Sequence, residues 1–311
     1  MPTPLPLPAL RRARSAFATA SPPVRAGVYA TLAAAFFAVM NALIRHCGTQ
    51  MHPFEVVFFR NLASLLFMLP WLWRIGLAGL HKERLAMHGL RAGVSLVSMI
   101  CGFTALTLIP LTEATALSFT APLFATAGAA LFLGETVRLR RWTAVLVGLA
   151  GTMVILRPDP ESLNIGAMLA LANALLVGVA QLLIKSLSRT ERPEEIVAFM
   201  GLFLTPLSLA PALFVWQWPG PGLLAALVAL GAVGTCGHLF MTRAFAEADV
   251  TIAMPFDFAR LPFIAAIAFV LYGEVPTLWT WAGGAVIFAS TLYIANREAK
   301  LARRKAAEGG P

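Results

Sequence analysis

The sequence predicts an all-α polytopic membrane protein with ten transmembrane helices, arranged as two inverted five-helix repeats. Two observations carry this prediction: a strongly apolar composition and an internal duplication. Of the 311 residues, 59% are hydrophobic and only 13% are charged, whereas soluble globular domains are about 25% charged. The apolar residues form blocks of about 17–25 residues, the length of a membrane-spanning helix. Because these blocks show no period-two alternation, an outer-membrane barrel is excluded.

The predicted spans follow one another with short connections. They are expected at residues 27–45, 54–73, 85–109, 112–134, 142–156, 165–185, 195–216, 222–243, 251–272 and 278–296. The first repeat then covers residues 27–157 and the second covers residues 165–296. Residues 1–26 are expected to form a disordered basic tail, and residues 297–311 a second basic tail, both in the cytoplasm.

The duplication is visible in the residues themselves. Residues 44–62 align with residues 184–202 without a gap, and a second register, shifted by one residue, pairs Phe119 with Phe258. Each repeat has an odd number of spans, so the second copy must enter the bilayer from the opposite face. Duplicated hydrophobic helices are typical of secondary transporters, which bind their substrate where the two copies meet.

The net charge of +9 is explained by topology. With a cytoplasmic N-terminus, twenty of the 24 lysines and arginines fall on the cytoplasmic side, which is the bias of the positive-inside rule. Both termini are therefore expected in the cytoplasm, and Arg138 and Arg192 on the same side of the inner membrane. The excess of positive charge indicates contact with anionic lipid and no nucleic-acid partner.

Asp257 and Arg260 are the sharpest candidates for function. They lie in the middle of the ninth predicted span, where each charge costs at least about 2.5–3.5 kcal/mol. Three residues apart and opposite in sign, they share one helix face. Two interpretations stay open: a salt bridge that neutralises both charges, or a site in which Arg260 meets an anionic group and Asp257 a cation or a proton. Their repeat counterparts, Ser118 and Ala121, are uncharged, so such a site is asymmetric.

Arg60 and His238 are two further ionisable residues inside predicted spans. Arg60 is expected either to contact substrate or a gate, or to pair with Glu55. His238 is a candidate proton relay because histidine titrates near neutral pH, with a hydrogen bond to a neighbouring helix as the alternative. Asp257 is the other candidate for coupling transport to protons.

Amides and aromatic rings complete the candidate substrate-binding set. The buried amides Asn41 and Gln181 occupy equivalent positions in the two repeats, with interhelical hydrogen bonding as the alternative to ligand binding. Ser118 is included as the repeat counterpart of Asp257. Phe119 and Phe258 are included because phenylalanines stack on ring-bearing molecules, with packing in the core as the alternative. Prolines in the fourth and ninth spans predict matching kinks, which either line a shared cavity or are simple bends in packed helices.

Other classes of protein are less compatible with the sequence. Three cysteines and five histidines show neither CxxC nor zinc-ligand spacing, so no metal site and no cofactor are expected. No nucleotide-binding P-loop is present. A membrane-embedded enzyme, the main alternative, needs a nucleophile with a base or a metal cluster, and neither is visible. A subunit of a larger membrane assembly is the third class of function to be considered. The chain is expected to act as a monomer or a homodimer.

The motifs resemble a known family. The segments 105–117, 122–124 and 131–135, and the second copy ending in Gly273-Glu274, resemble the EamA repeat of the drug/metabolite transporter superfamily. The resemblance implies a ten-helix inner-membrane carrier that works by alternating access and is not an enzyme. Residues 254–262 and 273–281 are similar to the branch with S-adenosylmethionine uptake carriers, which implies a small polar metabolite, S-adenosylmethionine-like or amino-acid-derived, as substrate. Efflux of drugs or metabolites is the alternative within the family.

Overall fold

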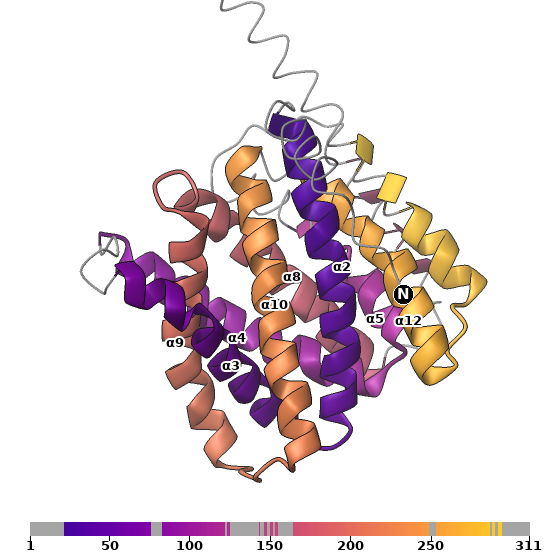
Figure 1. Ribbon diagram of the computed structural model, residues 1–311. Helices are drawn as coiled ribbons and strands as arrows, with labels where there is room; N and C mark the ends of the chain where they lie inside the picture. Colours follow the sequence, from indigo (N-terminus) through magenta and orange to yellow (C-terminus); the bar gives the residue numbers. More distant parts are fainter. Residues whose placement is uncertain are drawn as a thin grey trace, which may run out of the picture.

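The computed structural model of the chain is built of helices (Figure 1). The structure describes residues 22–75, 83–121, 123–124, 143, 146–147, 150–151, 153–154, 164–248, 253–286, 288–289 and 292–293, and no strand occurs among them. The elements are α2 (Pro22–Gly48), α3 (Pro53–Ile75), α4 (Leu85–Leu108), α5 (Leu111–Ser118), α8 (Ile165–Leu187), α9 (Pro193–Leu213), α10 (Pro221–Glu247), the 3-10 helix η2 (Met254–Ala259) and α12 (Arg260–Tyr272).

Six of these helices are long and apolar enough to cross a membrane: α2, α3, α4, α8, α9 and α10. They correspond to the first three and the sixth to eighth predicted spans, and their bounds differ from the predicted ones by a few residues. The fifth predicted span and residues 125–134 of the fourth lie largely outside the described residues, as do both predicted tails. Residues 278–286 begin the tenth predicted span as a helix. The total of ten spans therefore stays a prediction.

The ninth span was predicted at residues 251–272 with a kink at its prolines, and the structure shows a full interruption there. Residues 254–259 form a 3-10 helix, and the α-helix begins only at Arg260. The equivalent element of the first repeat is interrupted at the same place, because α5 ends at Ser118 and Phe119 and Thr120 form a turn. Pro262 lies in the first turn of α12, where the missing N–H has no intrahelical partner to lose.

Equivalent helices of the two repeats run in opposite directions. The end of α2 at Gly48 and the start of α8 at Gly166 both pack against the end of α4. At the other end of the bundle, Arg25 at the start of α2 pairs with Glu247 at the end of α10. This arrangement agrees with inverted repeats. We refer below to the Pro22 end and the Gly48 end of the bundle, after the two ends of α2.

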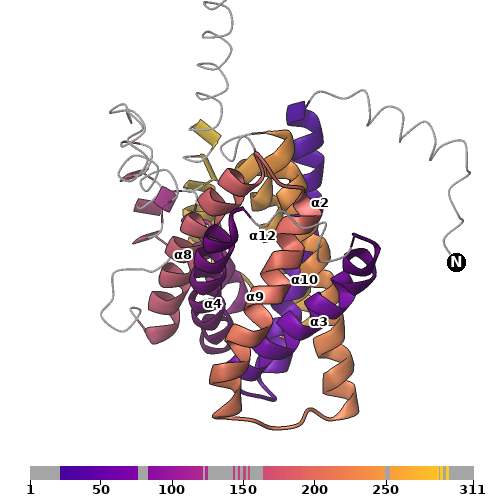
Figure 2. The ribbon, with the colours of Figure 1, turned by 90° about the vertical axis from the view of Figure 1, so that its left-hand side faces the viewer.

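The central helices pack across the two repeats. The most extensive contacts join α2 to α10 and α4 to α8, which are equivalent pairs under the exchange of repeats. Figure 1 shows α2 and α10 side by side, and Figure 2 shows α4 beside α8. Helices α3 and α9 pack against each other. The two repeats therefore form one bundle with a shared interior.

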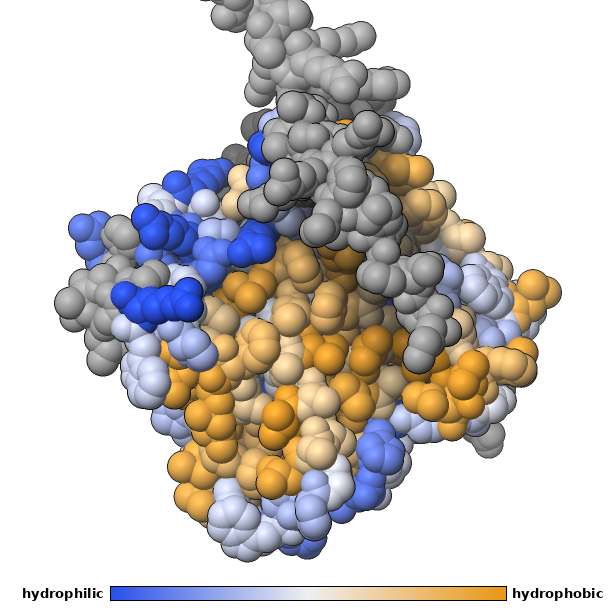
Figure 3. All heavy atoms as spheres, in the orientation of Figure 1, coloured by the Kyte–Doolittle hydropathy of each residue, from blue (hydrophilic) through white to orange (hydrophobic). Residues whose placement is uncertain are grey.

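The outer surface carries a broad hydrophobic band (Figure 3). On the face formed by α2 and α10, exposed apolar side chains include Val28, Leu32, Val39, Leu224 and Val228. Hydrophilic residues gather towards the two ends of the molecule in this view. An exposed apolar surface of this extent is unusual for a soluble monomer and is suited to lipid.

The contact between α3 and α10 depends on Gly231. A Cβ atom at this position would lie 2.3 Å from the Cβ of Ala63 and 2.9 Å from the backbone nitrogen of Ser64. The Ser64 hydroxyl also donates to the Gly231 carbonyl, at 3.2 Å. The two backbones therefore approach too closely for any side chain between them.

Gly231→Leu is expected to destabilise the bundle by at least about 1–3 kcal/mol, because overpacking forces α3 and α10 apart. The yield of monodisperse protein in size-exclusion chromatography and the melting temperature measure this effect. Gly222→Leu is the matched control, because a Cβ atom at Gly222 has no neighbour within 4 Å. Equal melting temperatures for the two variants would contradict the close contact.

Candidate functional site

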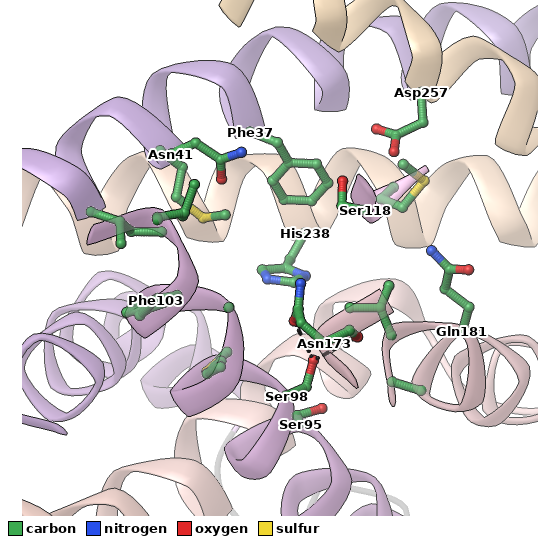
Figure 4. Close-up of a pocket in the computed structure, with 18 of the residues that line it drawn as sticks. Phe37, Asn41, Ser95, Ser98, Phe103, Ser118, Asn173, Gln181, His238 and Asp257 are labelled. Atoms are coloured by element: carbon green, nitrogen blue, oxygen red, sulfur yellow. Dashed lines mark hydrogen bonds between the residues drawn. The ribbon is translucent and has the colours of Figure 1, made fainter. Parts of the chain in front are cut away.

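A central cavity lies between the two repeats. It offers about 200 Å³ to water-sized molecules and is lined by side chains from α2, α3, α4, α5, α8, α9, α10, η2 and α12. Figure 4 shows polar groups from several helices pointing into it, with His238 near the centre of the view. The lining mixes many apolar side chains with a few polar and charged ones, as in small-molecule sites.

Equivalent positions of the two repeats line this cavity together. Helices α2 and α8 contribute matched residues 140 positions apart, and α4 and α10 contribute matched residues 139 positions apart. The pairs are Phe37 and Val177, Met40 and Ala180, Asn41 and Gln181, Ile44 and Ile184, Met99 and His238, Gly102 and Met241, and Leu106 and Phe245. The internal duplication read in the sequence therefore places the cavity on the pseudo-twofold axis of the molecule.

The charged residues break this symmetry. Arg60 faces the cavity where its counterpart is Met200, and Asp257 does so where its counterpart is Ser118. His238 likewise corresponds to Met99. The walls therefore have a common origin but distinct chemistry, which suits a ligand with unlike ends.

Asp257 and Arg260 form the ion pair that their spacing predicts. The Arg260 Nη2 donates to the Asp257 Oδ2 at 2.6 Å, and both residues line the cavity. The Asp257 Oδ1 and the Arg260 Nε have no hydrogen-bond partner among the described residues. The Arg260 guanidinium also lies 5.4 Å from the ring centre of Phe119 and 5.8 Å from that of Phe37. The pair therefore has free polar edges next to the cavity.

Arg60 is fully buried on α3 and lines the cavity. Its Nη1 donates to the Oδ1 of Asn61 at 2.8 Å, whereas its Nε and Nη2 have no hydrogen-bond partner among the described residues. The predicted alternative of pairing with Glu55 is wrong, because the Glu55 carboxylate instead accepts the backbone N–H of Gln217. A helical spacing of five residues places the two side chains on different faces.

Arg91 is a cavity residue that the sequence analysis missed. It is one of the twenty basic residues that the positive-inside rule places on the cytoplasmic side, but it is 2% exposed and lines the cavity. Its Nη1 donates to the carbonyl of Ile196 at 3.1 Å, and its Nη2 lies 3.3 Å from the Met200 sulfur. Its position in the second turn of α4 is the only sequence signal, because the packing of α9 over that turn causes the burial.

A polar cluster occupies the middle of the cavity (Figure 4). Ser98 donates to the Oδ1 of Asn173 at 2.8 Å, joining α4 to α8. His238, on α10, packs edge-on against Phe37, with ring centres 5.2 Å apart. Ser95 lines the same wall one turn from Ser98. These groups supply hydrogen-bond donors and acceptors from both repeats to a bound molecule.

The remaining predicted residues divide into three groups. Asn41, Gln181 and Ser118 line the cavity, and the Gln181 Oε1 has no hydrogen-bond partner among the described residues. Asn41 also donates to the Thr115 hydroxyl at 3.4 Å, so its predicted interhelical bond is present. Phe119 is buried and is not among the described lining residues. The side chain of Phe258 lies outside the described residues.

Glu274 links α2 and α5 at the Gly48 end of the bundle. Its carboxylate pairs with Arg45 of α2 and accepts the backbone N–H of Leu111, at the start of α5, at 3.0 Å. The neighbouring Tyr272 hydroxyl donates to the Ala42 carbonyl at 2.9 Å. Gly273 ends α12 in the left-handed conformation, with a φ of 64°. Three elements from both repeats are therefore joined beside one end of the cavity.

This arrangement suits reversible binding of a small molecule. No group of three or more histidine, cysteine, aspartate or glutamate side chains able to hold a metal occurs among the described residues. The cavity instead offers guanidinium groups, amides, hydroxyls and an imidazole inside an apolar shell. Polar groups shielded from water interact strongly with a ligand that reaches them.

Most of the chain is similar to proteins named as transporters. It is 30% identical to the riboflavin transporter of Vibrio cholerae serotype O1, over 91% of this chain and 97% of that protein. It is 30% identical to the S-adenosylmethionine uptake transporter of Rickettsia felis, over 85% and 90%. The pseudopaline exporter of Pseudomonas aeruginosa is 29% identical, over 88% and 97%.

A solved crystal structure supports the fold. It is 22% identical in sequence and superposes with a TM-score of 0.64, covering 87% of this chain and 98% of that one. Residues 25–157 and 164–296 each match the EamA-like transporter family. The chain is therefore a membrane protein that belongs to the EamA-like transporter family, with one copy of the family repeat in each half.

Proposed function

We propose that this protein is a secondary carrier that moves a small polar organic metabolite across the bacterial cytoplasmic membrane by alternating access. The observation that carries the proposal is the central cavity, to which both repeats contribute equivalent positions. A binding site on the axis between inverted repeats is the arrangement that rocking of one repeat against the other exposes to each side in turn. Both termini then lie in the cytoplasm, as the charge distribution favours.

The substrate in this proposal is a riboflavin-like or S-adenosylmethionine-like metabolite. The names of the relatives support both candidates. Asp257, Arg260, Arg60, His238, Asn41, Gln181 and Ser118 form the proposed binding wall, and transport is coupled either to protons through Asp257 or His238, or to exchange of substrate. The polar atoms without protein partners on Arg60, Gln181 and Asp257 support this wall.

A cavity-filling substitution tests the proposal. Ser95→Phe places a ring in the cavity and is expected to lower the transport rate at least about tenfold, because the overpacked site loses 1–3 kcal/mol of substrate binding, by an order-of-magnitude estimate. Transport is measured in proteoliposomes with labelled riboflavin and S-adenosylmethionine, after a thermal-stability screen of metabolites has shown which probe binds.

Val97→Phe is the matched control. Val97 lies two residues from Ser95 on α4 and is 52% exposed on the outer surface, so the same ring faces lipid. This variant is expected to transport at a rate close to that of the native protein. Wild-type transport by Ser95→Phe, with normal expression, would rule out the cavity as the substrate path. Conversion of the probe into a new compound would favour the membrane-embedded enzyme instead.

A further inference from the structure

The charges of the cavity do not balance. The charged side chains among its described lining residues are Arg60, Arg91, Arg260 and Asp257. Asp257 is already paired with Arg260, so two arginines stand without a carboxylate from the lining. Neither forms an ion pair among the described residues, and both are at least 98% buried. A ligand with a complementary charge is therefore the natural partner for this wall.

Arg60 presents a free edge. Of its three guanidinium nitrogens only Nη1 has a protein acceptor, which is the Oδ1 of Asn61. The Nε and Nη2 lie on one side of the planar guanidinium group, as two parallel donors. This edge matches two oxygens of a carboxylate or a phosphate, the geometry in which arginine binds an oxyanion most strongly.

The surroundings fix the direction of this edge. Asn61 holds the Nη1 from one side and donates from its own Nδ2 to the Ser208 hydroxyl at 3.4 Å. On the other side lies Gly234 of α10, where a Cβ atom would stand 3.0 Å from the Nη2 and 3.2 Å from the Nε. Because residue 234 is a glycine, no side chain at this position stands against the two buried donors. His238 lies one turn further along α10. The guanidinium is thus preorganised, which lowers the entropic penalty of binding.

We propose that the transported molecule carries an oxyanion, and that Arg60 binds it through Nε and Nη2. Arg91 adds positive potential at the Pro22 side of the same cavity and retains an unpartnered Nε. The inference rests on the proposed carrier function and narrows its substrate class to organic acids or phosphate esters. A neutral molecule or a simple cation leaves the buried Arg60 guanidinium without an anionic partner.

Simple oxyanions test this proposal without knowledge of the substrate. Purified protein is melted in sodium acetate, sodium phosphate or sodium chloride at equal ionic strength, and in acetamide, the uncharged match of acetate. An oxyanion that binds only the folded state raises the melting temperature. We expect acetate, phosphate or both to raise it by at least about 2 °C more than chloride does. A response to acetate indicates a carboxylate, and a response to phosphate alone indicates a phosphate ester.

Arg60→Gln is expected to remove this extra shift, and Arg60→Lys, which keeps the charge but loses the fork, to reduce it. The control is Arg243→Gln, which removes one positive charge from a partly exposed ion pair with Glu194 outside the cavity and is expected to keep the full shift. An equal shift in Arg60→Gln would overturn the proposal. So would the absence of any shift beyond that of chloride in the native protein for both acetate and phosphate, with acetate no better than acetamide. The acetamide comparison needs no variant and stands even if Arg60→Gln fails to fold.

The carrier function and the oxyanion substrate class can be disproved independently of each other. If Ser95→Phe blocks transport but no oxyanion gives an Arg60-dependent shift, the carrier stands and the substrate class is wrong. If Ser95→Phe transports normally, the cavity is not the substrate path and the carrier mechanism itself is wrong.

Discussion

Asp257→Asn is expected to abolish substrate accumulation driven by a pH gradient while leaving exchange of labelled for unlabelled substrate measurable. Asparagine keeps the shape of the side chain but takes up no proton. The Asp257 Oδ1 has no hydrogen-bond partner among the described residues and the residue lines the cavity, so a proton can reach it with the substrate. A buried carboxylate in a membrane helix, with its counter-charge one turn away, is a frequent device for proton relay.

The same substitution also leaves Arg260 without its carboxylate. Breaking a buried ion pair from one side costs about 3–5 kcal/mol, so a lower yield of folded protein is expected as well. The double variant Asp257→Asn with Arg260→Gln removes both charges, and replacement of a whole buried pair is often close to neutral for stability. Stability is therefore expected to recover in the double variant, whereas pH-driven accumulation is not.

Proteoliposomes with an imposed pH gradient separate the two interpretations of the pair. If the double variant regains pH-driven accumulation, the pair serves structure alone. If Asp257→Asn itself accumulates substrate like the native protein, Asp257 is not the coupling site. His238→Gln is then the next variant, because His238 is the other titratable side chain at the centre of the cavity (Figure 4).

The long helices were predictable because the bilayer imposes their length. The apolar run from Leu85 ends near Ile109, and α4 covers Leu85–Leu108 almost as expected. The interruption of the ninth span at Met254–Ala259 was not predictable in the same way. The prolines of this span indicate a kink, but they do not specify its form, which is a 3-10 helix packed against α2.

The candidate site was predictable where the residue type is costly in lipid. Asp257, Arg260, Arg60 and His238 stood out because charge and polarity are rare in spans, and the cavity collects all four. Arg91 did not stand out, since a basic residue near the end of a span is usually a topology signal. Only the packing of α9 over α4 reveals that it is buried.

Contacts between distant residues were the least predictable. No pattern in the sequence indicates a partner for Glu274. The structure joins Glu274 to Arg45 and to the Leu111 N–H, both in the other repeat. No spacing rule connects positions so far apart in the chain, because the pairing depends on how the repeats dock.

This Glu274 contact leads to a prediction about gating that rests on the proposed alternating access. If the Gly48 end of the bundle opens during transport, α2, α5 and the end of α12 must separate there, and the contacts of Glu274 must break. Glu274→Ala removes a partly exposed ion pair and the acceptor at the start of α5. Together these contribute about 2 kcal/mol, which is equivalent to about a thirtyfold change in the population open at this end.

Cys47 reports on this opening. It is fully buried in the last turn of α2, two residues from Arg45, and a membrane-impermeant thiol reagent reaches it only when the Gly48 end opens. In a background with Cys101→Ala and Cys236→Ala, Glu274→Ala is expected to raise the labelling rate of Cys47 at least about tenfold, a somewhat smaller factor than the population change.

The matched control is Glu247→Ala, which removes the carboxylate of the Arg25 ion pair at the Pro22 end of the bundle. Its side chain is similarly exposed, at 27% against 18% for Glu274, but its loss loosens the opposite end. Under alternating access, weakening the Pro22 end favours the conformation in which the Gly48 end is closed, so Cys47 is expected to stay protected or to label more slowly. Equal acceleration by both variants would indicate general loosening of the bundle and would remove Glu274 as a gate contact.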